Sequence, residues 1–102
     1  MQKNFRSYDL AVTFYQLTRT LRLSRNLKDQ LDRAAASVAL NLAEGSGRRT
    51  RADQKRFFAM AFGSLRECQA ILDLSADSNL TARQQADTLA AHIDCLIKSC
   101  GG

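Results

Sequence analysis

The chain has 102 residues, of which 45% are hydrophobic and 25% charged, and it has no proline and a net charge of +5. This length and composition fit one helical domain with a single core, and they exclude a disordered, collagen-like or turn-rich β protein. No apolar run approaches the roughly 20 residues that span a bilayer, and the N-terminal residues lack the hydrophobic region of a signal peptide. We therefore expect one all-α domain over residues 1–102 that is cytoplasmic and has no membrane contact.

Apolar residues at steps of three and four predict two helices in the first half of the chain, over about residues 8–23 and 27–45. Ser7 is a suitable N-cap for the first helix, whose apolar stripe consists of Leu10, Phe14, Leu17 and Leu21. The second stripe consists of Leu27, Leu31, Ala34, Val38 and Leu42. We expect Gly45 and Gly47 to end the second helix, because glycine tolerates the left-handed conformation common at helix C-termini.

Two further helices are predicted over about residues 51–75 and 82–98, each after a pair with capping-box spacing, Thr50 with Asp53 and Thr81 with Gln84. The third helix has a narrow apolar stripe consisting of Phe58, Ala61, Leu65, Cys68 and Leu72. The apolar side chains outside this stripe are Phe57, Met60, Phe62, Ile71 and Leu74. A helix this widely apolar should be central or lie at a subunit interface. Four helices with short connections predict an antiparallel up-and-down four-helix bundle.

The three cysteines, Cys68, Cys95 and Cys100, lack the paired CxxC spacing of a zinc site and are odd in number. They therefore indicate neither a disulfide framework nor a metal centre. We interpret Cys68 and Cys95 as core residues. The alternative is a metal site formed by His92, Cys95 and Cys100, which would need a fourth ligand. We expect no metal and no cofactor.

A polar stripe lies on the second helix beside its apolar one. Its residues follow one another at steps of four, four and three and therefore share one side: Arg33, Ser37, Asn41 and Glu44. On the third helix, Ser64 and Glu67 lie one turn apart and follow Gly63, where two backbones could approach closely. This set is either a solvated face or a half-buried hydrogen-bonded network in which Arg33 meets Glu44 or Glu67. Because no nucleophile, histidine or metal set accompanies the two glutamates, we expect no enzyme activity.

Two strings in these helices are distinctive: RAAASVALNLAEGSGR over residues 33–48 and FFAMAFGSLRECQ over residues 57–69. They contain a Ser-x-x-x-Asn-x-x-Glu-Gly pattern and a Gly-Ser-x-x-Glu pattern, which fall on Ser37, Asn41, Glu44 and Gly45, and on Gly63, Ser64 and Glu67. Through these patterns the chain resembles the four-helix bundle proteins encoded in intervening sequences of bacterial 23S ribosomal RNA genes. The resemblance runs through most of the chain.

The resemblance implies an antiparallel four-helix bundle, a ring-like homopentamer and a basic surface on that ring. One branch of the family is similar to the accessory variability protein of diversity-generating retroelements, which works beside a reverse transcriptase and is thought to bind nucleic acid. For most members no activity is established. The resemblance therefore implies RNA, DNA, a reverse transcriptase or another protein as the partner.

The segment between the second and third helices is the densest charge cluster of the chain. It reads GSGRRTRADQKR over residues 45–56, with one acidic residue against Arg48, Arg49, Arg51, Lys55 and Arg56. Exposed cations near a helix N-terminus oppose the helix dipole by ~0.3–1 kcal/mol each, and an anion would relieve this repulsion. We expect these five side chains to contact phosphates of RNA or DNA, although a solvated loop is the alternative. No base-reading module is present, so charge and shape should govern binding.

A second and looser cluster of basic residues surrounds the first turn between helices and consists of Arg19, Arg22, Arg25 and Lys28. We interpret it as a solvated helix end. Because residues 1–56 carry 12 basic and 5 acidic side chains whereas residues 57–102 carry 3 and 5, the charge pattern favours an acidic partner. The alternative function is a protein-interaction scaffold or an accessory subunit of a nucleic-acid-processing enzyme.

Overall fold

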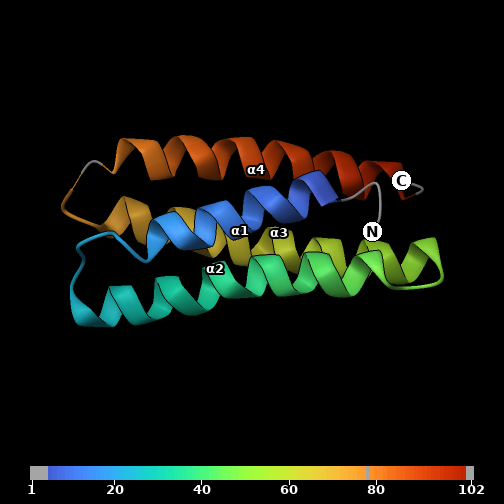
Figure 1. Ribbon diagram of the computed structural model, residues 1–102, viewed down its shortest axis with the longest axis horizontal. Coiled ribbons are helices and arrows are strands. Elements are labelled where there is room, and N and C mark those ends of the chain that lie inside the picture. Colours follow the sequence, from blue (N-terminus) through green and yellow to red (C-terminus); the bar gives the residue numbers. More distant parts are fainter. Residues whose placement is uncertain (1–4, 78, 101–102) are drawn as a thin grey trace.

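Four helices make up the part of the chain that the computed structural model describes, residues 5–77 and 79–100. They are α1 (Phe5–Thr18), α2 (Arg25–Ser46), α3 (Arg51–Leu74) and α4 (Leu80–Ser99). The helices alternate in direction along one long axis (Figure 1). Each helix packs against the next one in the chain, and α1 also packs against α4, which closes the bundle. The predicted all-α fold, an antiparallel four-helix bundle, is confirmed.

The core is built from the predicted apolar stripes. Its largest fully buried side chains are Phe14, Leu31, Val38, Leu42, Phe58, Leu65, Leu72, Leu89 and Ile93. Burying a side chain of this size contributes about 1.5–3 kcal/mol, so these contacts dominate the stability of the bundle. The additional apolar residues of α3 divide: Ile71 is buried, whereas Met60 and Leu74 are 42% and 71% exposed. The narrow stripe of α3 is therefore core, and part of its wider apolar surface has no cover within the described chain.

The first helix lies further toward the N-terminus than predicted. Ser7 is inside α1 and buried, so it is not the N-cap. The helix ends at Thr18 and not near residue 23. The ammonium group of Lys28 on α2 donates hydrogen bonds to the carbonyl oxygens that follow, those of Thr18, Arg19 and Leu21, at 3.0, 2.5 and 3.2 Å. This tertiary contact satisfies the carbonyl groups of the helix end, so the chain can leave the helix there.

The end of α2 also differs from the prediction. The helix continues through Gly45 to Ser46, and neither Gly45 nor Gly47 has a left-handed conformation. A Cβ atom at Gly45 would lie 2.7 Å from Cε1 of Phe58 and 3.1 Å from Cβ of Phe57. Gly45 therefore allows close approach of α2 and α3, which is a packing role and not a capping role.

The last helix begins two residues before the predicted boundary. Its N-cap is Asn79, which has a left-handed backbone with φ of 45° and makes no capping hydrogen bond. Asparagine tolerates this conformation, and its Nδ2 donates a hydrogen bond to Oγ of Ser75 at 2.9 Å, which holds the turn. Because α4 begins at Leu80, Thr81 and Gln84 lie inside the helix and do not form the expected capping box.

The cysteines differ in their surroundings. Cys68 is buried, as predicted, and burial raises the pKa of its thiol to about 12. Cys95 is exposed, which corrects its interpretation as a core residue. Among residues 5–77 and 79–100, no three His, Cys, Asp or Glu side chains are grouped closely enough to hold a metal ion. None of the described helices combines the length and the apolar character of a membrane-spanning segment.

Candidate nucleic-acid interface

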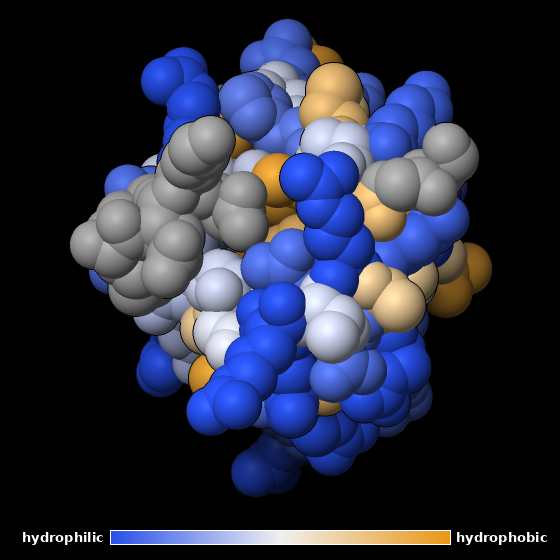
Figure 2. All heavy atoms as spheres, turned by 90° about the vertical axis from the view of Figure 1, so that its right-hand side faces the viewer, coloured by the Kyte–Doolittle hydropathy of each residue, from blue (hydrophilic) through white to orange (hydrophobic). Residues whose placement is uncertain are grey.

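The connection between α2 and α3 carries the five basic residues that the sequence singled out. We call residues 47–56 the basic elbow. The elbow lies at the end of the bundle where α4 also ends (Figure 1). Figure 2 looks onto this end, and hydrophilic residues cover most of the surface in view. Exposed basic side chains of the elbow are those of Arg49, Arg51 and Arg56, and half-exposed ones are those of Arg48 and Lys55.

Local hydrogen bonds explain why the cations gather at the start of α3. The amide of Gly47 donates to the carbonyl of Glu44 at 3.2 Å, which completes the last turn of α2. The side chain of Thr50 accepts a hydrogen bond from the amide of Asp53 at 3.1 Å, which confirms Thr50 as the N-cap of α3. The connection is therefore short, and it places the cations beside the partial positive charge of a helix N-terminus.

Two of the five basic side chains of the elbow stack on one aromatic ring. The Cζ atoms of Arg48 and Arg56 lie over the ring of Phe57, 4.6 and 4.7 Å from its centroid. Each guanidinium also contacts a carboxylate: Nη2 of Arg48 donates to Oε2 of Glu44 at 2.5 Å, and Nη2 of Arg56 donates to Oδ1 of Asp53 at 3.3 Å. This role of Phe57 was not predicted, although the adjacency of Arg56 and Phe57 is visible in the sequence.

The other three basic side chains of the elbow make fewer contacts within the described chain. Nη1 of Arg51 donates to the carbonyl oxygen of Ser99 at 3.4 Å, a long hydrogen bond that connects the elbow to the end of α4. Arg49 and Lys55 make no hydrogen bond or ion pair with the residues that the structure describes. These side chains keep most of their hydrogen-bonding capacity for an external anion.

Three of the six residues of the expected polar network come together. The Oγ atoms of Ser37 and Ser64 are 2.8 Å apart and connect α2 to α3. Nδ2 of Asn41 donates to the carbonyl oxygen of Ser37 at 2.9 Å and to its Oγ at 3.0 Å. All three side chains are half-buried, so their mutual hydrogen bonds replace part of the water that they lose.

The charged members of that set do not join the hydrogen bonds. Arg33, Glu44 and Glu67 are exposed. Glu44 pairs with Arg48, and within the described residues Arg33 pairs with neither Glu44 nor Glu67. Of the two alternatives drawn from the sequence, these charged residues follow the solvated face. Arg33 meets neither Glu44 nor Glu67, because these side chains lie on the outer surface, where water solvates them at little cost.

Exposed apolar side chains lie within about one helical turn of the residues that form the Ser37–Ser64 contact. Leu40, one turn after Ser37, is 68% exposed, and Met60 precedes Gly63 by one turn. Nothing lies within 4 Å of a Cβ atom added at Gly63. A glycine inside an exposed helix destabilises it by about 1 kcal/mol relative to alanine, and no neighbour among the described residues explains its presence.

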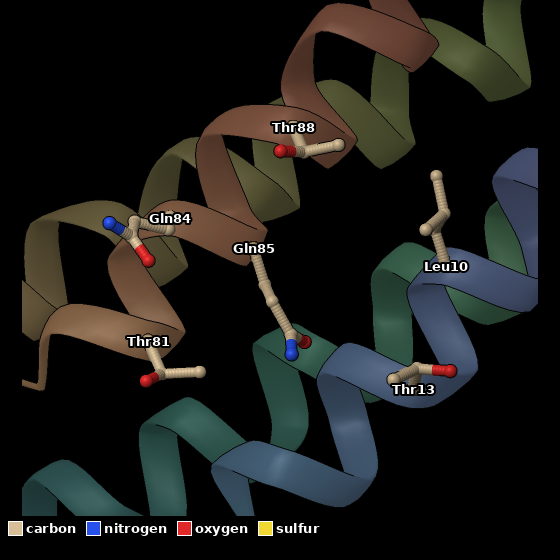
Figure 3. Close-up of a pocket in the computed structure, with 6 residues that line it drawn as sticks. All are labelled: Leu10, Thr13, Thr81, Gln84, Gln85 and Thr88. Atoms are coloured by element: carbon tan, nitrogen blue, oxygen red, sulfur yellow. The ribbon is translucent and has the colours of Figure 1, made fainter.

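A groove of about 250 Å³ lies between α1 and α4 (Figure 3). Its lining consists of Leu10, Thr13, Thr81, Gln84, Gln85 and Thr88. These side chains offer hydroxyl and amide groups but no carboxylate, imidazole or amine. The groove can therefore form hydrogen bonds, but its lining supplies no acid or base for catalysis near neutral pH.

A family model described as 23S rRNA-intervening sequence protein matches residues 4–102, which is nearly the whole chain. No curated protein matches the chain.

Proposed function

Because the chain belongs to the 23S rRNA-intervening sequence protein family, we propose that it is a non-enzymatic homo-oligomeric bundle that binds RNA or DNA through the basic elbow. The family is not known as an enzyme family. The observation that carries the proposal is the gathering of five basic side chains at one helix connection, beside the N-terminus of α3. Cations at this position weaken the helix, and the phosphates of a nucleic acid would reverse that effect.

The homo-oligomer that we propose uses the outer face of α2 and α3. A second copy packed on this face would cover Leu40 and Met60, and its backbone could approach closely at Gly63. The family resemblance implies five copies in a ring. In such a ring the elbow would be repeated around the axis, and several weak contacts would add to a useful affinity.

A different protein on the same apolar face is the second candidate function. The chain would then be a scaffold or an accessory subunit, for example of a reverse transcriptase. Isolated protein would bind nucleic acid weakly, and a pull-down would yield one stoichiometric protein partner that persists after nuclease treatment. That outcome would replace the first proposal.

A salt titration tests the nucleic-acid proposal. The affinity of the protein for a single-stranded RNA and a single-stranded DNA oligonucleotide should fall with salt, with a log–log slope of about −0.7 for each phosphate neutralised. Replacing Arg48, Arg49 and Arg51 with alanine should make that slope less negative. If the slope stays unchanged in this variant, the elbow is not the binding site.

Light scattering tests the oligomer separately. We expect a species several times the 11.3 kDa of one chain. Gly63→Lys should reduce the mass, because a charged side chain then projects from the apolar face. Thr88→Lys, which adds the same charge at an exposed position of α4, is the control and should leave the mass unchanged. A wild-type monomer at micromolar concentration would contradict the ring.

A further inference from the structure

Arg48 and Arg56 are held at a restricted distance from each other. Their Cζ atoms lie 4.6 and 4.7 Å from the centroid of the same Phe57 ring, so they are at most about 9 Å apart. An exposed arginine ordinarily samples many rotamers, and stacking on an aromatic face reduces that freedom. The two guanidinium groups are therefore arranged before any ligand arrives.

The ring that carries them is itself fixed in place. Phe57 is half-buried and precedes Phe58, which is 1% exposed. Its Cβ atom would be only 3.1 Å from a Cβ atom at Gly45, so the end of α2 packs directly against it. The ring therefore rests on the junction of two helices, and Arg56 reaches it from α3 whereas Arg48 reaches it from the connection before α3.

The carboxylates at this site hold the arginines only loosely. Glu44 accepts one hydrogen bond from Arg48, and Nε of Arg48 is shielded from solvent without a hydrogen-bond partner in the described chain. The side chains of Glu44 and Asp53 are 53% and 43% exposed, and exposed ion pairs of this kind contribute little. A phosphate can use the guanidinium fork with two parallel hydrogen bonds, so it can displace such a carboxylate.

We propose that Arg48 and Arg56, stacked on Phe57, form a clamp for two successive phosphates of one nucleic-acid strand, and that Glu44 occupies one phosphate position in the free protein. This inference rests on the nucleic-acid function proposed above. Successive phosphates are neighbouring anions on one strand, so they suit two guanidinium groups that are held close together on one ring. Glu44 then acts as a built-in competitor that weakens binding.

The test uses the full chain and an unstructured single-stranded oligonucleotide, with affinity measured by fluorescence anisotropy at low salt. Glu44→Gln should bind about three- to fivefold more tightly than wild type, because one competing carboxylate is lost. Glu67→Gln is the matched control: it removes the same charge from an exposed glutamate of α3 that has no ion pair with the described residues. Its affinity should stay within about twofold of wild type.

A double-mutant cycle assigns the effect to the contact. In a background of Arg48→Ala, the substitution Glu44→Gln should give no gain. Phe57→Leu removes the ring but keeps an apolar side chain, and it should weaken binding while circular dichroism confirms the helical fold. If Phe57→Leu fails to fold, the Glu44–Arg48 cycle still decides the question.

Four results would overturn the clamp. If the Glu44→Gln and Glu67→Gln variants have equal affinities, Glu44 is not a competitor. If Glu44→Gln still increases the affinity in the Arg48→Ala background, the increase comes from the change in net charge and not from the Glu44–Arg48 contact. If wild type binds with an elbow-dependent salt slope but Glu44→Gln does not bind more tightly, this inference fails and the proposed function stands. If no variant binds, both fail.

Discussion

Both ends of the bundle carry clusters of basic residues, but one cluster lies at the C-terminus of a helix and the other at the N-terminus of a helix. At the end opposite the basic elbow, which we call the distal end, Lys28 donates to carbonyl groups at the C-terminus of α1. Arg19 at the same end lies over the ring of Tyr15 and donates to its hydroxyl group at 3.2 Å. At the elbow, the cations surround the N-terminus of α3. Cations stabilise a helix C-terminus and destabilise an N-terminus.

This difference shows that charge density alone does not identify a binding surface. At the distal end, part of the positive charge completes the structure of the chain, as the hydrogen bonds of Lys28 demonstrate. At the elbow, the two ion pairs are exposed, and Arg49 and Lys55 have no partner among the described residues. The elbow is therefore the better candidate for an external anion, and the comparison can be tested at both ends.

Removing three positive charges from either end should change the salt dependence of nucleic-acid binding by very different amounts, and this is the largest difference that we expect between the two ends. Replacing Arg48, Arg49 and Arg51 with alanine should change the log–log slope of nucleic-acid affinity against salt by about +2, at about 0.7 for each lost contact. Replacing Arg19, Arg22 and Arg25 with alanine removes the same charge and should change the slope by less than about 0.7. Equal changes in the two variants would mean that net charge, and not the elbow, governs binding.

The shape of the elbow should be sensitive to Gly45. Gly45→Ala places a methyl group against the buried ring of Phe58, and overpacking of this kind should lower the free energy of unfolding by ~1–3 kcal/mol. Gly47→Ala is the control, because the nearest atom to its added Cβ is a backbone oxygen at 3.7 Å. Urea denaturation should show no loss for this variant. Equal stability of both variants would contradict the close approach of α2 and α3.

Two lysines distinguish a structural cation from an available one. Lys28→Met should lower the free energy of unfolding by ~1–2 kcal/mol, because the carbonyl groups at the end of α1 lose a charged donor. Lys55→Met at the elbow should change it by no more than about 0.5 kcal/mol. Thermal or urea denaturation measures both variants. A larger loss for Lys55→Met would reverse the comparison of the two ends.

The buried thiol of Cys68, between the two ends, reports whether these substitutions leave the core intact. Its pKa of about 12 keeps it protonated in the folded state, so a thiol reagent at pH 8 should modify exposed Cys95 quickly and Cys68 only after unfolding. The unfolded chain loses this proton near the usual value of 9.0, so stability should fall as pH rises from about 9 toward 12. Rapid labelling of Cys68 in an elbow variant would show that the variant disturbs the core.

Much of the fold could be predicted from local sequence patterns. The apolar stripes identified core residues such as Phe58, Leu65 and Leu72, and Thr50 was correctly assigned as the N-cap of α3. The basic segment was placed at a helix connection because Gly45 and Gly47 were expected to end one helix and Thr50 to begin the next. These features depend on the 3.6-residue period and on hydrogen bonds within a few residues, which a sequence displays directly.

The tertiary structure decided which residues meet across the bundle. Gly45 fits the sequence pattern of a cap, but the approach of Phe58 makes it a packing residue; α1 ends early because Lys28 reaches it from another helix. Only Ser37, Asn41 and Ser64 of the polar set form hydrogen bonds with one another. The sequence by itself determined four amphipathic helices and a basic connection. The packing of many side chains sets the register and the distance between α2 and α3. This tertiary arrangement decided that two arginine side chains stack on Phe57.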